Sequence, residues 1–77
     1  MMNWIEIFLQ ELWNAWDFVE CYKENGNILH LMSAGGHREE AFHYLSMAKE
    51  SLSKEEWKVW SEIYWDFYTD LNNFVLQ

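Results

Sequence analysis

Three histidines and several carboxylates are the side chains that could bind a metal ion in this chain. Glu39 and His43 lie one helical turn apart, and His37 stands at the start of the same predicted helix. A zinc site needs a third and usually a fourth ligand of fixed geometry. A Glu and His pair at this spacing more often forms a hydrogen bond between turns of a surface helix. The pattern therefore predicts no metal ion and no cofactor.

Catalytic motifs are the second kind of chemistry to look for. The sequence has no Gly-rich phosphate loop, no His-Glu-x-x-His and no Cys-x-x-Cys. Ser33 precedes Ala34 and a glycine pair, but it lacks the glycine two positions earlier that a nucleophile elbow has. Nothing near Cys21 in the sequence indicates an activated thiolate. We therefore expect a protein that is not an enzyme.

Acidic residues gather on one side of the predicted C-terminal helix. Glu55, Glu62, Asp66 and Asp70 fall within about 80° of one another when the helix turns by about 100° per residue. We call these four residues the acidic ridge, and we expect it to face solvent and to attract a basic partner. The alternative is that these carboxylates only keep a small, aromatic-rich domain in solution.

Trp65 stands apart from the apolar stripe of the same helix. It lies about 130° from the centre of that stripe, and tryptophan is enriched among the residues that anchor protein interfaces. Val59 also lies off the stripe, in line with the carboxylates. We predict that Trp65 binds a partner together with the acidic ridge, unless it packs under residues 27–32 or against a second subunit.

The charge balance limits the classes of partner. Thirteen acidic and five basic residues give a formal net charge of −8. Phosphate backbones and anionic lipids repel such a chain, so we expect a basic protein surface as the partner and neither nucleic acid nor membrane. The single cysteine excludes an intramolecular disulfide and favours the cytoplasm. Residues 1–19 are apolar but carry acidic side chains and no basic leader, so neither a signal peptide nor a membrane span is expected.

The first long helix is expected over residues 4–24. Asn3 followed by Glu6 has the spacing of a helix N-cap, and Asn25-Gly26 is typical of a left-handed helix end. The apolar sector of this helix is wider than one neighbouring helix can cover, with Trp13 at one margin. Its members are Ile5, Phe8, Leu9, Leu12, Ala15, Trp16, Val19 and Tyr22.

Glycines mark the middle of the chain. Residues 27–33 are too few to assign by periodicity and form either one or two helical turns or an extended link. We expect a short helix there. Gly35-Gly36 is then expected to separate it from a helix over residues 37–51.

The C-terminal helix is expected over residues 54–75. Its start carries both a hydrophobic staple, Leu52 with Trp57, and a capping box, Ser53 with Glu56. An apolar stripe follows at spacings of three and four residues. The stripe consists of Trp57, Trp60, Tyr64, Phe67, Leu71 and Phe74.

These elements predict an all-α fold, a single helical domain over residues 1–77. It is a small helical bundle of two long helices, about 4–24 and 54–75, with a shorter helix at about 37–51 and a short helical segment at 27–33. The two wide aromatic faces favour a homodimer.

Two functions are consistent with a protein–protein interaction module of this kind. The first is a small acidic inhibitor that binds a basic surface of a nucleic-acid-handling complex. Phage-encoded anti-CRISPR and anti-restriction inhibitors are often similar in size and charge, and the likeness extends no further than that. The second is a homodimeric adaptor, antitoxin or regulatory subunit that uses its aromatic helix faces.

Overall fold

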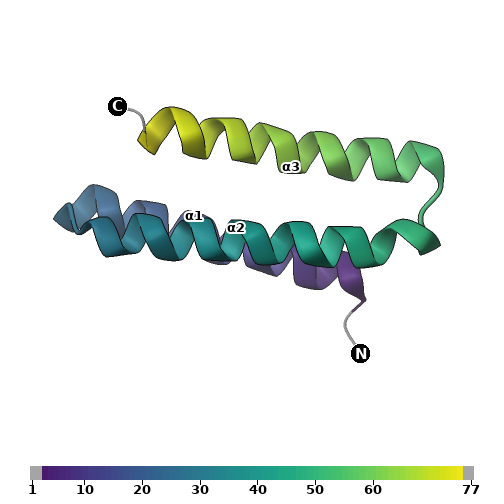
Figure 1. The fold of residues 1–77 in the computed structure, drawn as a ribbon, viewed down its shortest axis with the longest axis horizontal. Coiled ribbons are helices and arrows are strands. Elements are labelled where there is room, and N and C mark those ends of the chain that lie inside the picture. The colour runs from purple at the N-terminus through teal and green to yellow at the C-terminus, as the bar shows by residue number, and fades with distance from the viewer. Residues whose placement is uncertain (1–2, 76–77) are drawn as a thin grey trace.

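Three long α-helices form the part of the chain, residues 3–75, that a computed structural model describes. They are α1 (Trp4–Asn25), α2 (Ile28–Ala48) and α3 (Lys54–Val75). In Figure 1, α1 and α2 run back and forth beside each other, and α3 runs along the pair. The all-α helical bundle predicted from the sequence is confirmed.

Both ends of α1 are set by the residues that the sequence indicated. The Asn3 side chain accepts a hydrogen bond from the Glu6 backbone N–H at 2.9 Å, which satisfies one of the free donors at the helix start. At the other end Gly26 adopts a left-handed conformation with φ 70°, and its N–H donates to the Tyr22 carbonyl at 2.7 Å. The predicted helix over 4–24 is therefore confirmed to within one residue.

The second helix is longer than expected. It begins after Asn27, whose side chain accepts a hydrogen bond from the Leu29 N–H at 3.0 Å. The segment 27–33 was expected to be helical, and residues 28–33 are. They are the first turns of α2, however, and not a separate element.

The expected break at Gly35-Gly36 is wrong, because both glycines lie inside α2. Among the described residues only Gly26 has a positive φ, so neither of the paired glycines ends a helix. A glycine costs a helix about 1 kcal/mol relative to alanine. Ala34 and Ala41, which are fully buried in clusters shared with α1, offset that cost.

The start of α3 follows the prediction. A 3-10 helix, η1 (Lys49–Ser51), follows α2, so the helix expected to end at residue 51 closes with a tighter turn. The Ser53 hydroxyl accepts from the Glu56 N–H at 3.1 Å, and the Glu56 carboxylate accepts from the Ser53 N–H at 3.0 Å. These reciprocal bonds confirm the capping box. Hydrogen bonding of the Glu56 carboxylate to the Ser53 backbone N–H, and secondarily to the Ser53 side chain as donor, holds the pKa of Glu56 below its ordinary value.

The core has two parts with different side chains. One cluster contains Phe8, Leu12, Ala41, Leu45 and Tyr64, and the other contains Ala15, Val19, Ala34 and Leu71. Buried alanines lie between α1 and α2 beside larger side chains, whereas large rings make most of the connection of α3 to the pair. The Phe8 ring, for example, meets Trp60 edge-on at 6.4 Å between centroids. The ribbon of α3 is therefore set apart from the other two in Figure 1. The side chains of Phe74 and Val75 lie outside the described part of the chain.

Candidate protein-binding site

The acidic ridge is carried on an outward face of α3. Glu55, Glu62, Asp66 and Asp70 are all exposed. The capping box fixes the start of the helix, and the burial of Tyr64 and Leu71 on another face fixes its rotation. The four carboxylates thus lie on a helix whose orientation is set by its core contacts.

Trp65 lies beside α2 and contacts a residue of that helix, which the sequence of α3 alone does not predict. It is 52% exposed, and its ring centroid lies 6.4 Å from that of Phe42 in α2. Within α3 it contacts Tyr64 at 5.2 Å and Tyr68 at 5.3 Å. Trp65 therefore belongs to an aromatic surface shared by α2 and α3.

The predicted partner-binding residues accordingly divide between two surfaces. By helical position Glu62 lies about 60° from Trp65, whereas Asp70 lies about 140° away. Asp66 falls between them at about 100°. A flat partner cannot cover Trp65 and the far end of the acidic ridge equally well.

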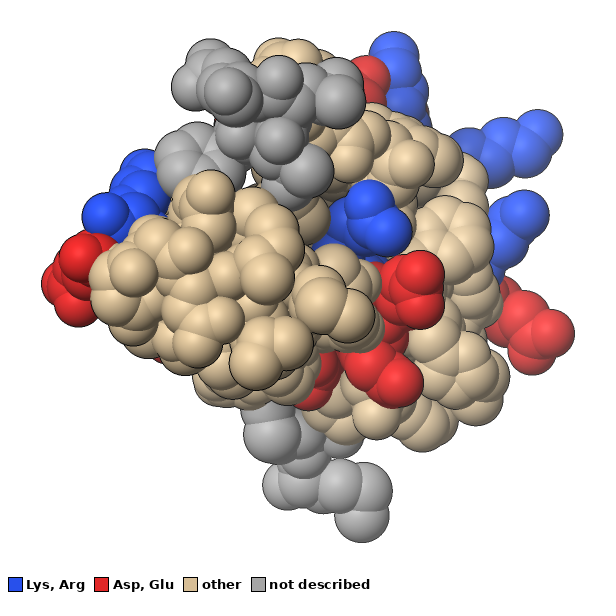
Figure 2. Space-filling view, turned by 60° about the vertical axis from the view of Figure 1, so that its left-hand side comes forward, with Lys and Arg blue, Asp and Glu red and all other residues tan. Residues whose placement is uncertain are grey.

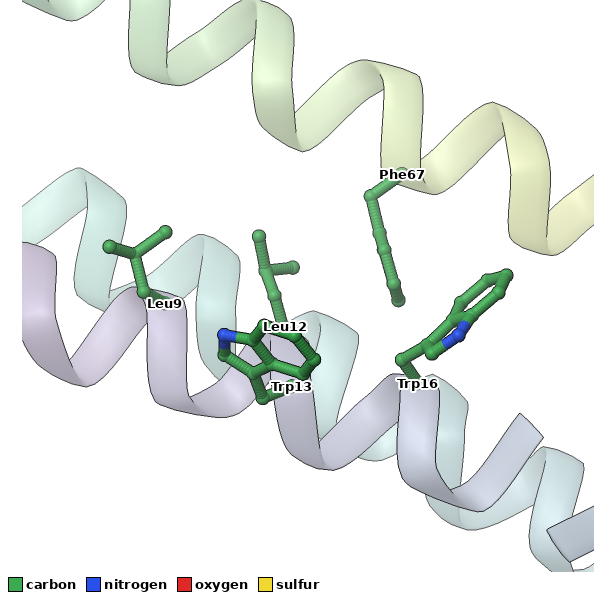
Figure 3. Close-up of a pocket in the computed structure, with 5 residues that line it drawn as sticks. All are labelled: Leu9, Leu12, Trp13, Trp16 and Phe67. Carbon is green, nitrogen blue, oxygen red and sulfur yellow. The ribbon is translucent and has the colours of Figure 1, made fainter. Parts of the chain in front are cut away.

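An apolar groove between α1 and α3 was not predicted. Figure 3 shows Trp13 and Trp16 on α1, with Phe67 reaching down from α3. Leu9 and Leu12 complete the lining, and the groove is open to solvent with a volume of about 330 Å³. Trp13 is 66% exposed. We call these five residues the α1–α3 groove.

The sequence held only part of the signal for this groove. Trp13 stands at the margin of the apolar sector of α1, which indicates a residue that the core does not fully cover. Whether Trp13 borders a groove depends on the distance between α1 and α3. The residue pattern of a single helix does not predict that distance.

A further apolar surface lies at the turn between α1 and α2. Ile28, Leu29 and Met32 are each more than half exposed. Figure 2 brings this end of the molecule forward and shows a broad area without charged side chains, bordered by acidic and basic residues. The side chains of Asn25 and Asn27 at this turn are engaged in hydrogen bonds with neighbouring residues.

The histidine with a carboxylate partner is His37, and not His43 of the Glu39 and His43 pair considered from the sequence. His37 lies in the middle of α2, and its Nδ1 is 2.6 Å from the Glu11 carboxylate of α1. Its ring stacks on Phe18 at 5.3 Å. This contact ties α1 to α2. Within residues 3–75 no three His, Cys, Asp or Glu side chains come together as metal ligands.

Comparison of the chain with protein-family models, curated proteins and solved structures gives no significant match. None of the helices in the described part of the chain is both long enough and apolar enough to cross a membrane.

Proposed function

We propose that this protein is a non-enzymatic interaction module, a small acidic inhibitor that binds a basic surface of a nucleic-acid-handling complex. The observation that supports the proposal is the acidic ridge, whose four residues are exposed on a helix held in place by its buried face. The inhibitor would act in the cytoplasm, where a chain with one cysteine remains reduced. In size and charge this protein is similar to many anti-CRISPR and anti-restriction proteins.

The mechanism is competition for positive charge. Glu62, Asp66 and Asp70 repeat about every 6 Å along the helix, whereas a DNA strand carries one phosphate about every 3.4 Å. The acidic ridge therefore has about half the charge density of the strand. It would occupy a basic groove by complementary potential, with Trp65 as an apolar anchor at the α2 side.

Charge reversal tests this function. Glu62→Lys, Asp66→Lys and Asp70→Lys together should abolish capture of a basic, nucleic-acid-handling protein from extracts of the native cells. Capture by the unchanged protein should weaken as salt rises. A matched variant, with Glu24, Glu40 and Glu50 changed to lysine, alters the net charge equally at exposed positions outside α3. Equal capture by the two variants would exclude the acidic ridge as the binding surface.

A second function is favoured by the exposure of Trp13. A homodimeric adaptor, antitoxin or regulatory subunit would bury the α1–α3 groove in a symmetric interface. In that case the protein should sediment as a dimer at micromolar concentration, and Trp13→Ala should convert it to a folded monomer. A monomeric parent protein would count against this function.

A further inference from the structure

The α1–α3 groove has the geometry of a helix-binding site. Its α1 wall is formed by Leu9, Leu12, Trp13 and Trp16, which follow one another at intervals of three, one and three residues. Such side chains form the ridges and hollows into which a neighbouring helix packs. α2 covers the other side of α1 through the buried alanines, so the groove lies where a fourth helix would complete a bundle.

The α1 rim of the groove is acidic. Glu20 pairs with Lys23 at 3.3 Å, and the Lys23 ammonium lies 5.2 Å from the centre of the Trp16 ring. These contacts bring the Glu20 carboxylate to one end of the groove. Glu6 and Asp17 are also exposed, and they lie within about 40° of Trp13 around the helix.

The α3 rim is acidic as well. Asp66 directly precedes Phe67, and Asp70 follows it by three residues, so both lie on the solvent side of this lining ring. Both are exposed. The lysines of α3, Lys54 and Lys58, fall about 140° to 180° from Phe67 around the helix. They therefore point away from the groove.

The remaining basic residues are bound elsewhere. The Arg38 guanidinium lies 4.5 Å from the centre of the Tyr68 ring, on the surface shared by α2 and α3. Lys49 lies 5.0 Å from the centre of the Trp57 ring, at the start of α3. The groove is thus apolar along its floor and acidic along both edges, with Lys23 already paired to Glu20.

We propose that the α1–α3 groove binds a basic amphipathic helix of the partner protein. Its apolar face would pack on Trp13, Trp16 and Phe67, and lysines or arginines on either side would face the two acidic rims. This inference rests on the proposed function, because it specifies the basic partner of that function. A second copy of this chain fits less well, since a two-fold interface would bring the acidic rims together.

A pair of synthetic peptides tests the charge and the location together. Each peptide has about 21 residues, or three heptads, with leucine at the a and d positions. One carries lysine at positions e and g, and the other carries glutamate. The full chain, labelled with ¹⁵N, reports binding through the indole N–H signals of its six tryptophans, which single Trp→Phe variants assign.

The basic peptide should shift the indole signals of Trp13 and Trp16 and leave that of Trp65 in place. Trp13→Ala should weaken binding about tenfold or more, as expected for an interface anchor. The glutamate peptide should bind at least about tenfold more weakly than the lysine peptide. Leu29→Ala, at an exposed apolar position of α2 outside the groove lining, is the matched control and should bind like the parent protein.

Three results would overturn the inference. The glutamate peptide could bind as tightly as the lysine peptide, or the shifts could fall on Trp65 instead of Trp13 and Trp16. The chain alone could also form a dimer that Trp13→Ala dissociates, which would assign the groove to a second copy. If Trp13→Ala does not fold, a spin label on the lysine peptide must broaden the Trp13 signal of the parent protein.

The peptide experiment and the capture experiment can fail separately. Capture that depends on Glu62, Asp66 and Asp70, combined with no peptide binding, would reject the groove and keep the inhibitor function. Peptide binding at Trp13, combined with capture that ignores those three residues, would reject the inhibitor function and keep the groove.

Discussion

The contact between α1 and α2 contains small buried alanines beside aromatic stacks such as Trp4 on Tyr44, whereas α3 is connected to that pair mainly through large rings. Ala15 and Ala34, both fully buried, allow α1 and α2 to approach closely. α3 instead reaches α1 through aromatic rings, such as Phe67 against Trp16 at 6.0 Å between centroids. Small residues therefore bring α2 close to one side of α1, whereas large rings hold α3 at a distance and leave the groove between α1 and α3.

Removing a large ring at the α3 contact should have the largest effect. Phe8 is fully buried and meets both Trp60 and Tyr64 of α3. Phe8→Ala should lower the free energy of unfolding by about 3–5 kcal/mol, because it removes a core ring and leaves a cavity. Urea unfolding followed by circular dichroism measures the loss. A loss below about 1 kcal/mol would mean that α3 does not depend on this ring.

Enlarging a small residue at the α1–α2 contact tests the other side of the comparison. Ala34 is fully buried beside Ala15 and Val19. Ala34→Leu should destabilise the fold by about 1–3 kcal/mol, because the close approach leaves no room for the added carbons. Ser46→Leu in the same helix is exposed and serves as the control. Similar unfolding midpoints for the two variants would contradict a close contact at Ala34.

The sequence predicted those features that depend on neighbouring residues. Ser53 and Glu56 form a capping box because its four positions are local, and Gly26 ends α1 for the same reason. The break predicted at Gly35 and Gly36 was wrong, because packing of α2 on α1 supplies the free energy that keeps these glycines helical.

The candidate site was predictable only in part for a related reason. The exposure of the acidic ridge follows from the periodicity of one helix. The contact of Trp65 with Phe42, and the opening of the groove beside Trp13, depend on how two helices are spaced. The periodicity of one helix does not predict the distance to its neighbour.

Alanine at the two mid-helix glycines should sharpen the comparison by strengthening α2 itself. A Cβ added at Gly35 or Gly36 would have no atom within 4 Å, apart from its own helix backbone and chain neighbours. Gly35→Ala with Gly36→Ala should therefore stabilise the protein by about 1–2 kcal/mol in total. Thermal unfolding measures the gain. Gly26→Ala, at φ 70°, is the contrasting control and should destabilise. A loss of stability in the double variant would show that α2 needs its glycines.

The smallest effect concerns the capping box that starts α3. Hydrogen bonds that the Glu56 carboxylate accepts from the Ser53 backbone N–H and, secondarily, from the Ser53 side chain lower its pKa from the ordinary value of 4.5. Because the folded pKa is the lower one, the carboxylate adds stability at pH values above 4.5, and this stability is lost as the pH falls through the folded pKa. Glu56→Gln keeps the shape of the side chain and removes its charge.

The difference in unfolding midpoint between the parent protein and Glu56→Gln should therefore be present at pH 7 and shrink towards zero below the folded pKa. Urea titrations of both proteins across this pH range measure it, and the other carboxylates, common to both, cancel in the comparison. Glu55→Gln removes a charge at an exposed neighbouring position of α3 outside the capping box and is the control. A difference between the parent and Glu56→Gln that stays constant with pH would mean that the charge of Glu56 plays no part in holding the start of α3, and that the bond from the residue 56 N–H to the Ser53 hydroxyl is enough.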